Sequence, residues 1–252
     1  MIGLIKNEWL KLFNNKKFYW FLLLLLIIYL FPVFMTFVVR MSTFNGQVYP
    51  LTLFGVITSL VMPLFLIVLV AEIVTEDYLS GNLSLTIIQP VTRVQVLTAK
   101  VFFLFQVILF LLLLCLLLGY GVGTFIYGWG SEFMLRGKTY SQLTGIQLTV
   151  MSYVSASLPL LAFSLLNMFI AIIVPSAAAV VGISAGIFFF STIISLLVDI
   201  GPILINTYFN TLPFILDYYS GQSLAPGLFV ISFGLIFYLL TLFIFIRKDM
   251  VL

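Results

Sequence analysis

The run VFFLFQVILFLLLLCLLLGYGVGTFIY, from Val101 to Tyr127, is 27 residues long and contains no charged side chain. A helix of about 20 apolar residues crosses the ~30 Å hydrocarbon core of a bilayer, so this run is long enough to span a membrane. It is continuous and leucine-rich, without the alternation of polar and apolar residues that is typical of membrane β-strands. The run therefore predicts a transmembrane helix.

The rest of the chain has the same character, with 63% hydrophobic and 8% charged residues, whereas soluble domains carry about 25% charged residues. Five further apolar runs have a suitable length: Phe18–Val39, Leu51–Val74, Leu143–Val174, Ser176–Val198 and Pro226–Ile246. We therefore expect an all-α integral membrane protein with six transmembrane helices. One domain would cover 1–252, with an N-terminal helix at 1–17, the six-helix bundle at 18–246 and a tail at 247–252.

Pro175 separates the fourth and fifth runs. Proline lacks a backbone N–H and disfavours the helical conformation of the residue before it, here Val174. We therefore expect a tight turn at this point rather than one very long helix.

Lysine and arginine predict the orientation, because cytoplasmic segments of membrane proteins are enriched in both. With the N-terminus inside, eight lie in cytoplasmic segments (Lys6, Lys11, Lys16, Lys17, Arg93, Lys100, Arg247 and Lys248) and three in outer ones (Arg40, Arg136 and Lys138). We expect a multi-pass protein of the plasma membrane with both termini in the cytoplasm and no cleaved signal peptide. The net charge of +3 then reflects topology, and no nucleic-acid partner is expected.

The N-terminal residues form an amphipathic pattern. Ile2, Ile5, Trp9, Leu12 and Phe13 recur at steps of three and four residues, which is typical of a helix that lies in the membrane interface. This helix could orient the first span or contact a cytoplasmic partner, and the two roles are compatible.

The sequence lacks the motifs that several kinds of active site require. The sequence RGKT, 136–139, is the nearest approach to a phosphate-binding loop, but Glu132 stands where its first glycine should be. The carboxylates divide between two predicted sides of the membrane, with Glu72, Glu76 and Asp77 on one and Glu132, Asp199 and Asp217 on the other. With one cysteine, Cys115, and no histidine, we expect no catalytic residues, no metal site and no cofactor bound by this chain.

The predicted spans hold no charged side chain near their middle, which disfavours an ion-coupled carrier. Their small residues include Gly182 and Gly186, whose spacing permits close approach of another helix. Packing within one protomer is the first expectation for this pair, and a seam between two copies is the alternative.

The stretch AEIVTEDYLSGNLSLTIIQPVTRVQVLTAK, Ala71 to Lys100, is the one long polar interruption inside the predicted bundle on the cytoplasmic side. Gly81 with Asn82 can end the second helix, residues 83–89 are apolar enough for a short interfacial helix, and Pro90 would stop it. A compact bend of this kind could be received in a groove of a soluble protein.

At these residues the sequence resembles the type-2 ABC exporter permeases. That family has an acidic residue after the second span, a Gly-Thr pair, a short coupling helix, the pattern P-V-x-R and a lysine that opens the third span. The matching residues are Glu76, Gly81, the helix of Leu83, Ser84, Leu85, Thr86, Ile87, Ile88 and Gln89, then Pro90, Arg93 and Lys100. Asn82 departs from the usual threonine.

The resemblance implies the partners and the mechanism. Members pair as two permease subunits, identical or related, with two separate nucleotide-binding ATPase subunits, which would bind ATP and Mg²⁺. Closure of the ATPase dimer would then move the coupling helix. The family also has a short outer hairpin between the fifth and sixth spans, and residues 199–225 are suited to it, as a cap or as a gate.

The leading functional expectation is the permease subunit of an ABC exporter. Its cargo would be amphipathic or hydrophobic, such as an antimicrobial or toxin peptide, a drug or a lipid, because the spans are apolar and aromatic. One alternative is a membrane scaffold or sensor that recruits an ATPase without transport. A channel or an ion-coupled carrier is the other.

Overall fold

The computed structural model describes residues 2–39, 45–76, 92–130, 132–135, 137–198, 203–219 and 225–247. The elements of the first half are α1 (Ile2–Asn14), α2 (Lys16–Val39), α3 (Tyr49–Val56), the π-helical turn η1 (Ile57–Val61), α4 (Met62–Ala71), the π-helical turn η2 (Glu72–Glu76) and α7 (Arg93–Tyr127). Those of the second half are β1 (Phe133–Leu135), β2 (Lys138–Tyr140), α8 (Gln142–Ile173), α9 (Ala177–Leu197), the 3-10 helix η4 (Ile205–Tyr208), α10 (Leu212–Tyr219) and α11 (Ala225–Arg247).

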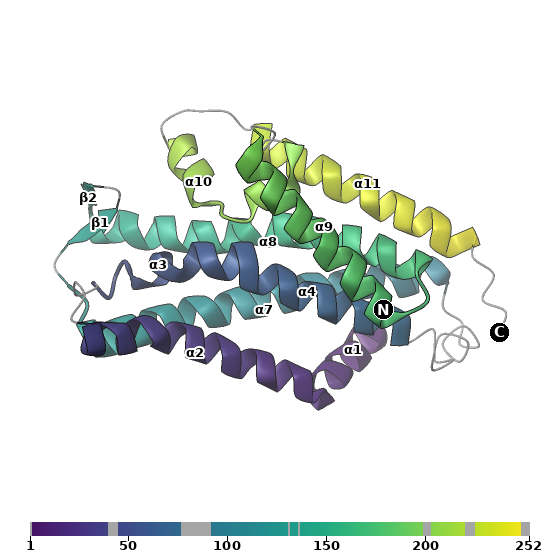
Figure 1. Ribbon diagram of the computed structural model, residues 1–252, viewed down its shortest axis with the longest axis horizontal. Coiled ribbons are helices and arrows are strands. Elements are labelled where there is room, and N and C mark those ends of the chain that lie inside the picture. The colour runs from purple at the N-terminus through teal and green to yellow at the C-terminus, as the bar shows by residue number, and fades with distance from the viewer. Residues whose placement is uncertain are drawn as a thin grey trace.

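Six helices of the described chain are long and apolar enough to cross a membrane, which confirms the predicted all-α integral membrane fold. They are Lys16–Thr36, Tyr49–Thr75, Arg93–Tyr127, Gln142–Ile173, Ala177–Ser195 and Ala225–Arg247. The second of them is built from α3, η1, α4 and η2 in succession. Helix α1 and the last turn of α11 lie at one end of the bundle, and the β1–β2 hairpin lies at the other (Figure 1). We call these the termini end and the hairpin end.

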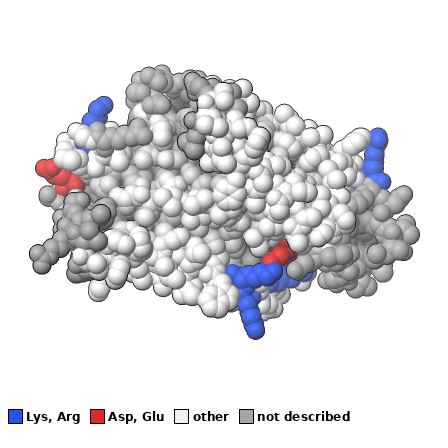
Figure 2. Space-filling model, viewed as in Figure 1, with Lys and Arg blue, Asp and Glu red and all other residues white. Residues whose placement is uncertain are grey.

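Charged side chains avoid the middle of the bundle. On the face shown in Figure 2 they form two groups, one at the left edge and one along the lower and right edges, with an uncharged band between them. Such a band is what a bilayer core requires, because an ion there costs several kcal/mol. The protein is therefore a multi-pass membrane protein.

Helix α8 is the centre of the bundle and packs against α4, α7, α9 and α11. Its buried face is rich in small residues, among them Ser152, Ala156, Ala162 and Ser164, which allow neighbouring helices to come close. Its buried serines bond within the helix, and Ser164 Oγ donates to the carbonyl four residues earlier at 2.8 Å. Its buried Tyr153 hydroxyl instead donates to the Pro50 carbonyl of α3 at 2.9 Å and lies 3.1 Å from the Tyr29 hydroxyl of α2. Polar contacts between helices in the core are therefore made by tyrosine rather than by the small residues of α8.

Helices α3 and α7 approach each other closely. A Cβ atom placed on Gly123 would lie 2.7 Å from the Cβ of Tyr49, and one on Gly119 would lie 2.9 Å from the Cα of Pro50. Distances below 3 Å are shorter than real Cβ contacts. Only glycine therefore permits this crossing.

The predicted turn between the fourth and fifth runs is confirmed. Helix α8 ends at Ile173 and α9 begins at Ala177, with Val174 in an extended conformation (φ −95°, ψ 121°). The third helix differs from the prediction, because it begins at Arg93 rather than at Val101. A capping interaction at Thr92, described below, starts the helix two turns before the apolar run.

The described part of the segment between α9 and α11 packs onto the bundle. Tyr208 and Phe209 are buried, and the Thr211 hydroxyl donates to the Ser152 carbonyl of α8 at 2.7 Å. These contacts fix η4 and the start of α10 against α8. Residues 199–202 and 220–224 lie outside the described residues, and the outer hairpin stays a prediction.

Candidate functional site

The predicted coupling residues fall mainly outside the described part of the chain. Glu76 is the last residue of η2, and its side chain is not described. The residues outside are Gly81, Leu83, Ser84, Leu85, Thr86, Ile87, Ile88, Gln89 and Pro90. Their role in coupling stays a prediction. What the structure does describe is how both flanks of the segment 77–91 are held.

The flank after the segment is fixed by a helix cap. The Thr92 hydroxyl accepts a hydrogen bond from the Gln95 amide at 3.3 Å, and the Gln95 side chain accepts one from the Thr92 amide at 3.1 Å. This reciprocal pair satisfies two amides that the first turn of a helix otherwise leaves unpaired. Arg93 then donates from its guanidinium to the Ile246 carbonyl at 2.9 Å, which joins the start of α7 to the end of α11.

Lys100 joins both flanks of the segment. Its side chain is buried, and its Nζ donates to the Ile73 carbonyl of η2 at 2.8 Å. The same Nζ lies 3.4 Å from Glu8 Oε1 of α1, whose side chain is also buried. A buried charge is tolerated when it is paired and hydrogen-bonded. Lys100 therefore connects α1, η2 and α7 at one point.

Helix α1 lies along α7. The Trp9 indole N–H donates to Gln106 Oε1 at 3.0 Å, and its ring meets Phe103 and Phe110 edge-on at centroid distances of 5.5 and 5.8 Å. The amphipathic helix predicted for the N-terminus is thus packed on the bundle through Trp9 and Leu12, with Glu8 buried beside them, whereas Ile2 and Phe13 of the predicted apolar face are exposed.

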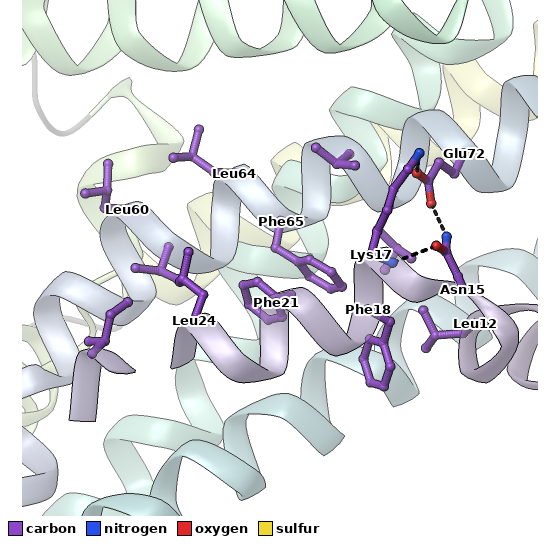
Figure 3. Close-up of a pocket in the computed structure, with 14 residues that line it drawn as sticks. Leu12, Asn15, Lys17, Phe18, Phe21, Leu24, Leu60, Leu64, Phe65 and Glu72 are labelled. Carbon is purple, nitrogen blue, oxygen red and sulfur yellow. Dashed lines mark hydrogen bonds and ion pairs between the residues drawn. The ribbon is translucent and has the colours of Figure 1, made fainter. Parts of the chain in front are cut away.

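The flank before the segment is held by the start of α2. Glu72 of η2 accepts a hydrogen bond from Asn15 Nδ2 at 2.7 Å and forms an ion pair with Lys17 (Figure 3). Asn15 also accepts a hydrogen bond from the Lys17 amide at 2.9 Å, which orders the junction of α1 and α2. We call Glu8, Asn15, Lys17, Glu72 and Lys100 the anchor network.

The sequence analysis missed this network as a unit. Lys17 was interpreted through topology, and Lys100 through topology and the family pattern that opens the third span. Glu72 was counted among the carboxylates on one side of the membrane, and Glu8 was given no role. A possible signal was the one acidic residue of the N-terminal helix, since Glu8 stands beside Trp9 at the edge of the apolar face. Its partner is 92 residues away in the sequence, and no local pattern identifies it.

Gly182 and Gly186 lie in open surroundings on α9. A Cβ atom added to either would meet no atom of a neighbouring element within 4 Å in the part of the chain that the structure describes. The close packing within one protomer that we expected is therefore not formed at these two positions. The alternative, a seam between two copies, stays a prediction.

The described residues include no group of three or more Asp, Glu, His or Cys side chains that could hold a metal ion. The anchor network has two acids and two bases in ion pairs and suits a mechanical connection rather than proton transfer to a substrate.

A model of the family described as "ABC-2 family transporter protein" matches residues 4–186. The match includes α1 from Leu4 onward, the anchor network and the whole segment 77–91. The chain belongs to the ABC-2 transporter family. A comparison of this ABC-2 chain with curated proteins gives no match. The predicted relationship to ABC permeases is confirmed, and the chain is a membrane component of an ABC-type transporter.

Proposed function

We propose that the chain is the permease subunit of an ABC exporter of the plasma membrane, whose residues 83–89 contact a separate ATPase subunit that binds ATP and Mg²⁺. The observation that carries the proposal is the bond from Lys100 to the Ile73 carbonyl. It joins the two flanks of the segment 77–91. A force applied to that segment would therefore move η2, α7 and α1 together.

The orientation follows from the charges at the two ends. Of the basic residues whose positions are described, Lys6, Lys11, Lys16, Lys17, Arg93, Lys100 and Arg247 belong to the termini end and Lys138 to the hairpin end. Cytoplasmic loops carry the excess of Lys and Arg. We assign the termini end to the cytoplasm, where an ATPase is accessible.

The cargo is amphipathic or hydrophobic. The described faces of the spanning helices are apolar and aromatic, with exposed Phe31, Phe190 and Phe243 among them. Such walls offer burial and ring contacts, and they lack the fixed charges that an ionic substrate would need. Two permease subunits would enclose the path, with the open glycines of α9 at their contact.

The first experiment is purification of the tagged chain from its native membrane in mild detergent, followed by mass spectrometry of the proteins that accompany it. We expect a stoichiometric soluble subunit with a phosphate-binding loop, and we expect it to be lost when residues 83–89 are scrambled. A chain that is purified without any ATPase would contradict the proposal and favour the carrier alternative.

The second experiment tests transmission through the anchor network. Lys100→Met would leave the buried Glu8 with Lys11, 3.3 Å away, as its remaining ion-pair partner among the described residues. The double variant with Glu8→Gln also removes the buried negative charge and is the better probe of coupling. We expect the double variant to keep the ATPase subunit bound while its stimulation of ATP hydrolysis falls by about tenfold, the loss expected of one charge-assisted hydrogen bond. Lys138→Met, at the hairpin end, is the matched control. Unchanged stimulation in the double variant would contradict transmission through Lys100.

A further inference from the structure

A groove runs between α2 and α4 and ends at the anchor network. It has a volume of about 500 Å³, within the ~300–1,000 Å³ of ordinary small-molecule sites. Its walls are Leu12, Phe18, Phe21, Leu24, Ile28, Leu60, Val61, Leu64, Phe65, Val68 and Leu69, and its polar end is Asn15, Lys17 and Glu72. Phe21 and Phe65 stack within it at a centroid distance of 3.8 Å, and Figure 3 shows both between the two helices.

The groove has the length of one membrane leaflet. On α2 it extends from Lys17 to Ile28, and on the facing helix from Glu72 back to Leu60. At ~1.5 Å per residue, eleven or twelve residues measure roughly 16 to 18 Å. This is about half of the ~30 Å hydrocarbon core. A fatty acyl chain of one leaflet has the same extent.

The groove cannot stay empty in a membrane. Leu24 and Leu60, at its apolar end, are 45% and 43% exposed, so the groove opens to its surroundings at hydrocarbon depth. Water does not fill an apolar groove, and an empty one would forfeit the dispersion contacts of its walls. An acyl chain supplies those contacts.

The polar end carries one charge of each sign. The Lys17 side chain is two-thirds exposed, and the Glu72 carboxylate beside it is 11% exposed. A phosphate can approach the exposed ammonium of Lys17, and an amine can share the Glu72 carboxylate with Lys17 and Asn15. A headgroup that holds both a phosphate and a protonated amine matches this arrangement, whereas a purely anionic headgroup would meet the Glu72 carboxylate.

We propose that the groove between α2 and α4 binds one aminophospholipid of the leaflet at the termini end. Its phosphate lies at Lys17, its amine at Glu72 and one acyl chain along Leu24, Leu60 and Leu64. The lipid adds to the contacts that already join α2 to the facing helix, which are the Phe21–Phe65 stack and the Lys17–Glu72 ion pair. This site does not depend on the proposed export function, because it needs neither an ATPase nor a cargo.

The test is native mass spectrometry of the purified chain after incubation with phosphatidylethanolamine, phosphatidylglycerol or phosphatidylcholine of identical acyl chains. We expect one retained phosphatidylethanolamine per chain, held about tenfold more tightly than phosphatidylglycerol, as one charge-assisted hydrogen bond allows. Glu72→Gln should remove this discrimination, and Lys17→Gln should weaken retention of both lipids. Equal retention of the two headgroups by the unmodified chain would overturn the proposal.

A matched pair of variants tests whether the lipid lies in the groove. Leu24→Trp fills the apolar end, and Leu23→Trp puts the same ring on the adjacent residue, which is 44% exposed and does not line the groove. We expect the first to lose the bound lipid and the second to keep it. Retention of the lipid by both variants would overturn the proposal. If Leu24→Trp also lost self-association while it kept the lipid, a second copy of the chain would be the occupant of the groove.

Discussion

Two glycine pairs with the same spacing lie in opposite surroundings. Gly119 and Gly123 of α7 bring α3 so close that an added Cβ would overlap Pro50 or Tyr49. At Gly182 and Gly186 of α9, such a Cβ would meet no atom of another described element within 4 Å. The spacing of small residues therefore shows that a helix can be approached closely. The tertiary arrangement decides which helix comes close, and whether that helix belongs to the same chain or to another copy.

The largest effect on stability is expected for a substitution at Gly123, where the two helices are in close contact. Gly123→Leu would force α3 away from α7, because the nearest obstacle is the Cβ of Tyr49, held by its own backbone. Overpacking costs ~1–3 kcal/mol, and a rigid neighbour places this site at the upper end of that range. We expect a clear fall in the melting temperature of the detergent-solubilised monomer.

Gly121 supplies the control for this variant. It lies on the same helix between the two close glycines, and a Cβ there would meet nothing within 4 Å. Gly121→Leu should melt close to the unmodified chain. A similar loss of stability in both variants would mean that a bulky residue anywhere in this turn is harmful, and the close crossing would not be the cause.

An intermediate effect is expected at Gly182, and it concerns association rather than stability. Gly182→Leu should leave the melting temperature of the monomer unchanged and reduce cross-linking between copies in the membrane by about tenfold, because a seam of small residues tolerates no large side chain. Gly227→Leu, an equally open position on α11, is the control. Unchanged cross-linking would exclude the seam at Gly182.

The smallest expected effect is on the melting temperature of two alanine variants, which should shift in opposite directions. Gly186→Ala gains helix propensity without a clash, which is worth up to about 1 kcal/mol. Gly119→Ala gains the same propensity but places its methyl group 2.9 Å from the Pro50 Cα. We expect a slightly higher melting temperature for the first and a lower one for the second. Equal shifts would mean that the α3–α7 crossing adjusts freely.

The sequence predicted the spanning helices well because each of them is a local feature. Membrane helices satisfy their backbone hydrogen bonds internally, so length and apolarity identify them without knowledge of their neighbours. Pro175 and Val174 likewise marked the turn between α8 and α9 through backbone effects on adjacent residues. The start of α7 was missed because its first two turns hold Arg93, Gln95 and Lys100, which conceal a helix from a search for apolar runs.

The candidate site was less predictable because its contacts join distant parts of the chain. Lys100 was noted for its charge, but its bond to the Ile73 carbonyl depends on how η2 and α7 pack. Glu8 became part of the network only because Trp9 fixes α1 along α7. The coupling residues 83–89 were predicted by resemblance, and they stay a prediction because they lie outside the described residues.

The π-helical turn η2 affects how the second span responds to the loss or gain of a residue. A π-helical turn contains one more residue than an α-helical turn, and each residue of an α-helix turns the chain by about 100°. Deletion of a single residue from Glu72–Glu76 would restore an α-helical turn and leave α4 intact. The direction in which the second span ends would change little, because the π-helical and the α-helical turn each complete one revolution. The end of the second span can thus absorb a change of one residue in chain length and still present the segment that follows Glu76 on the same side.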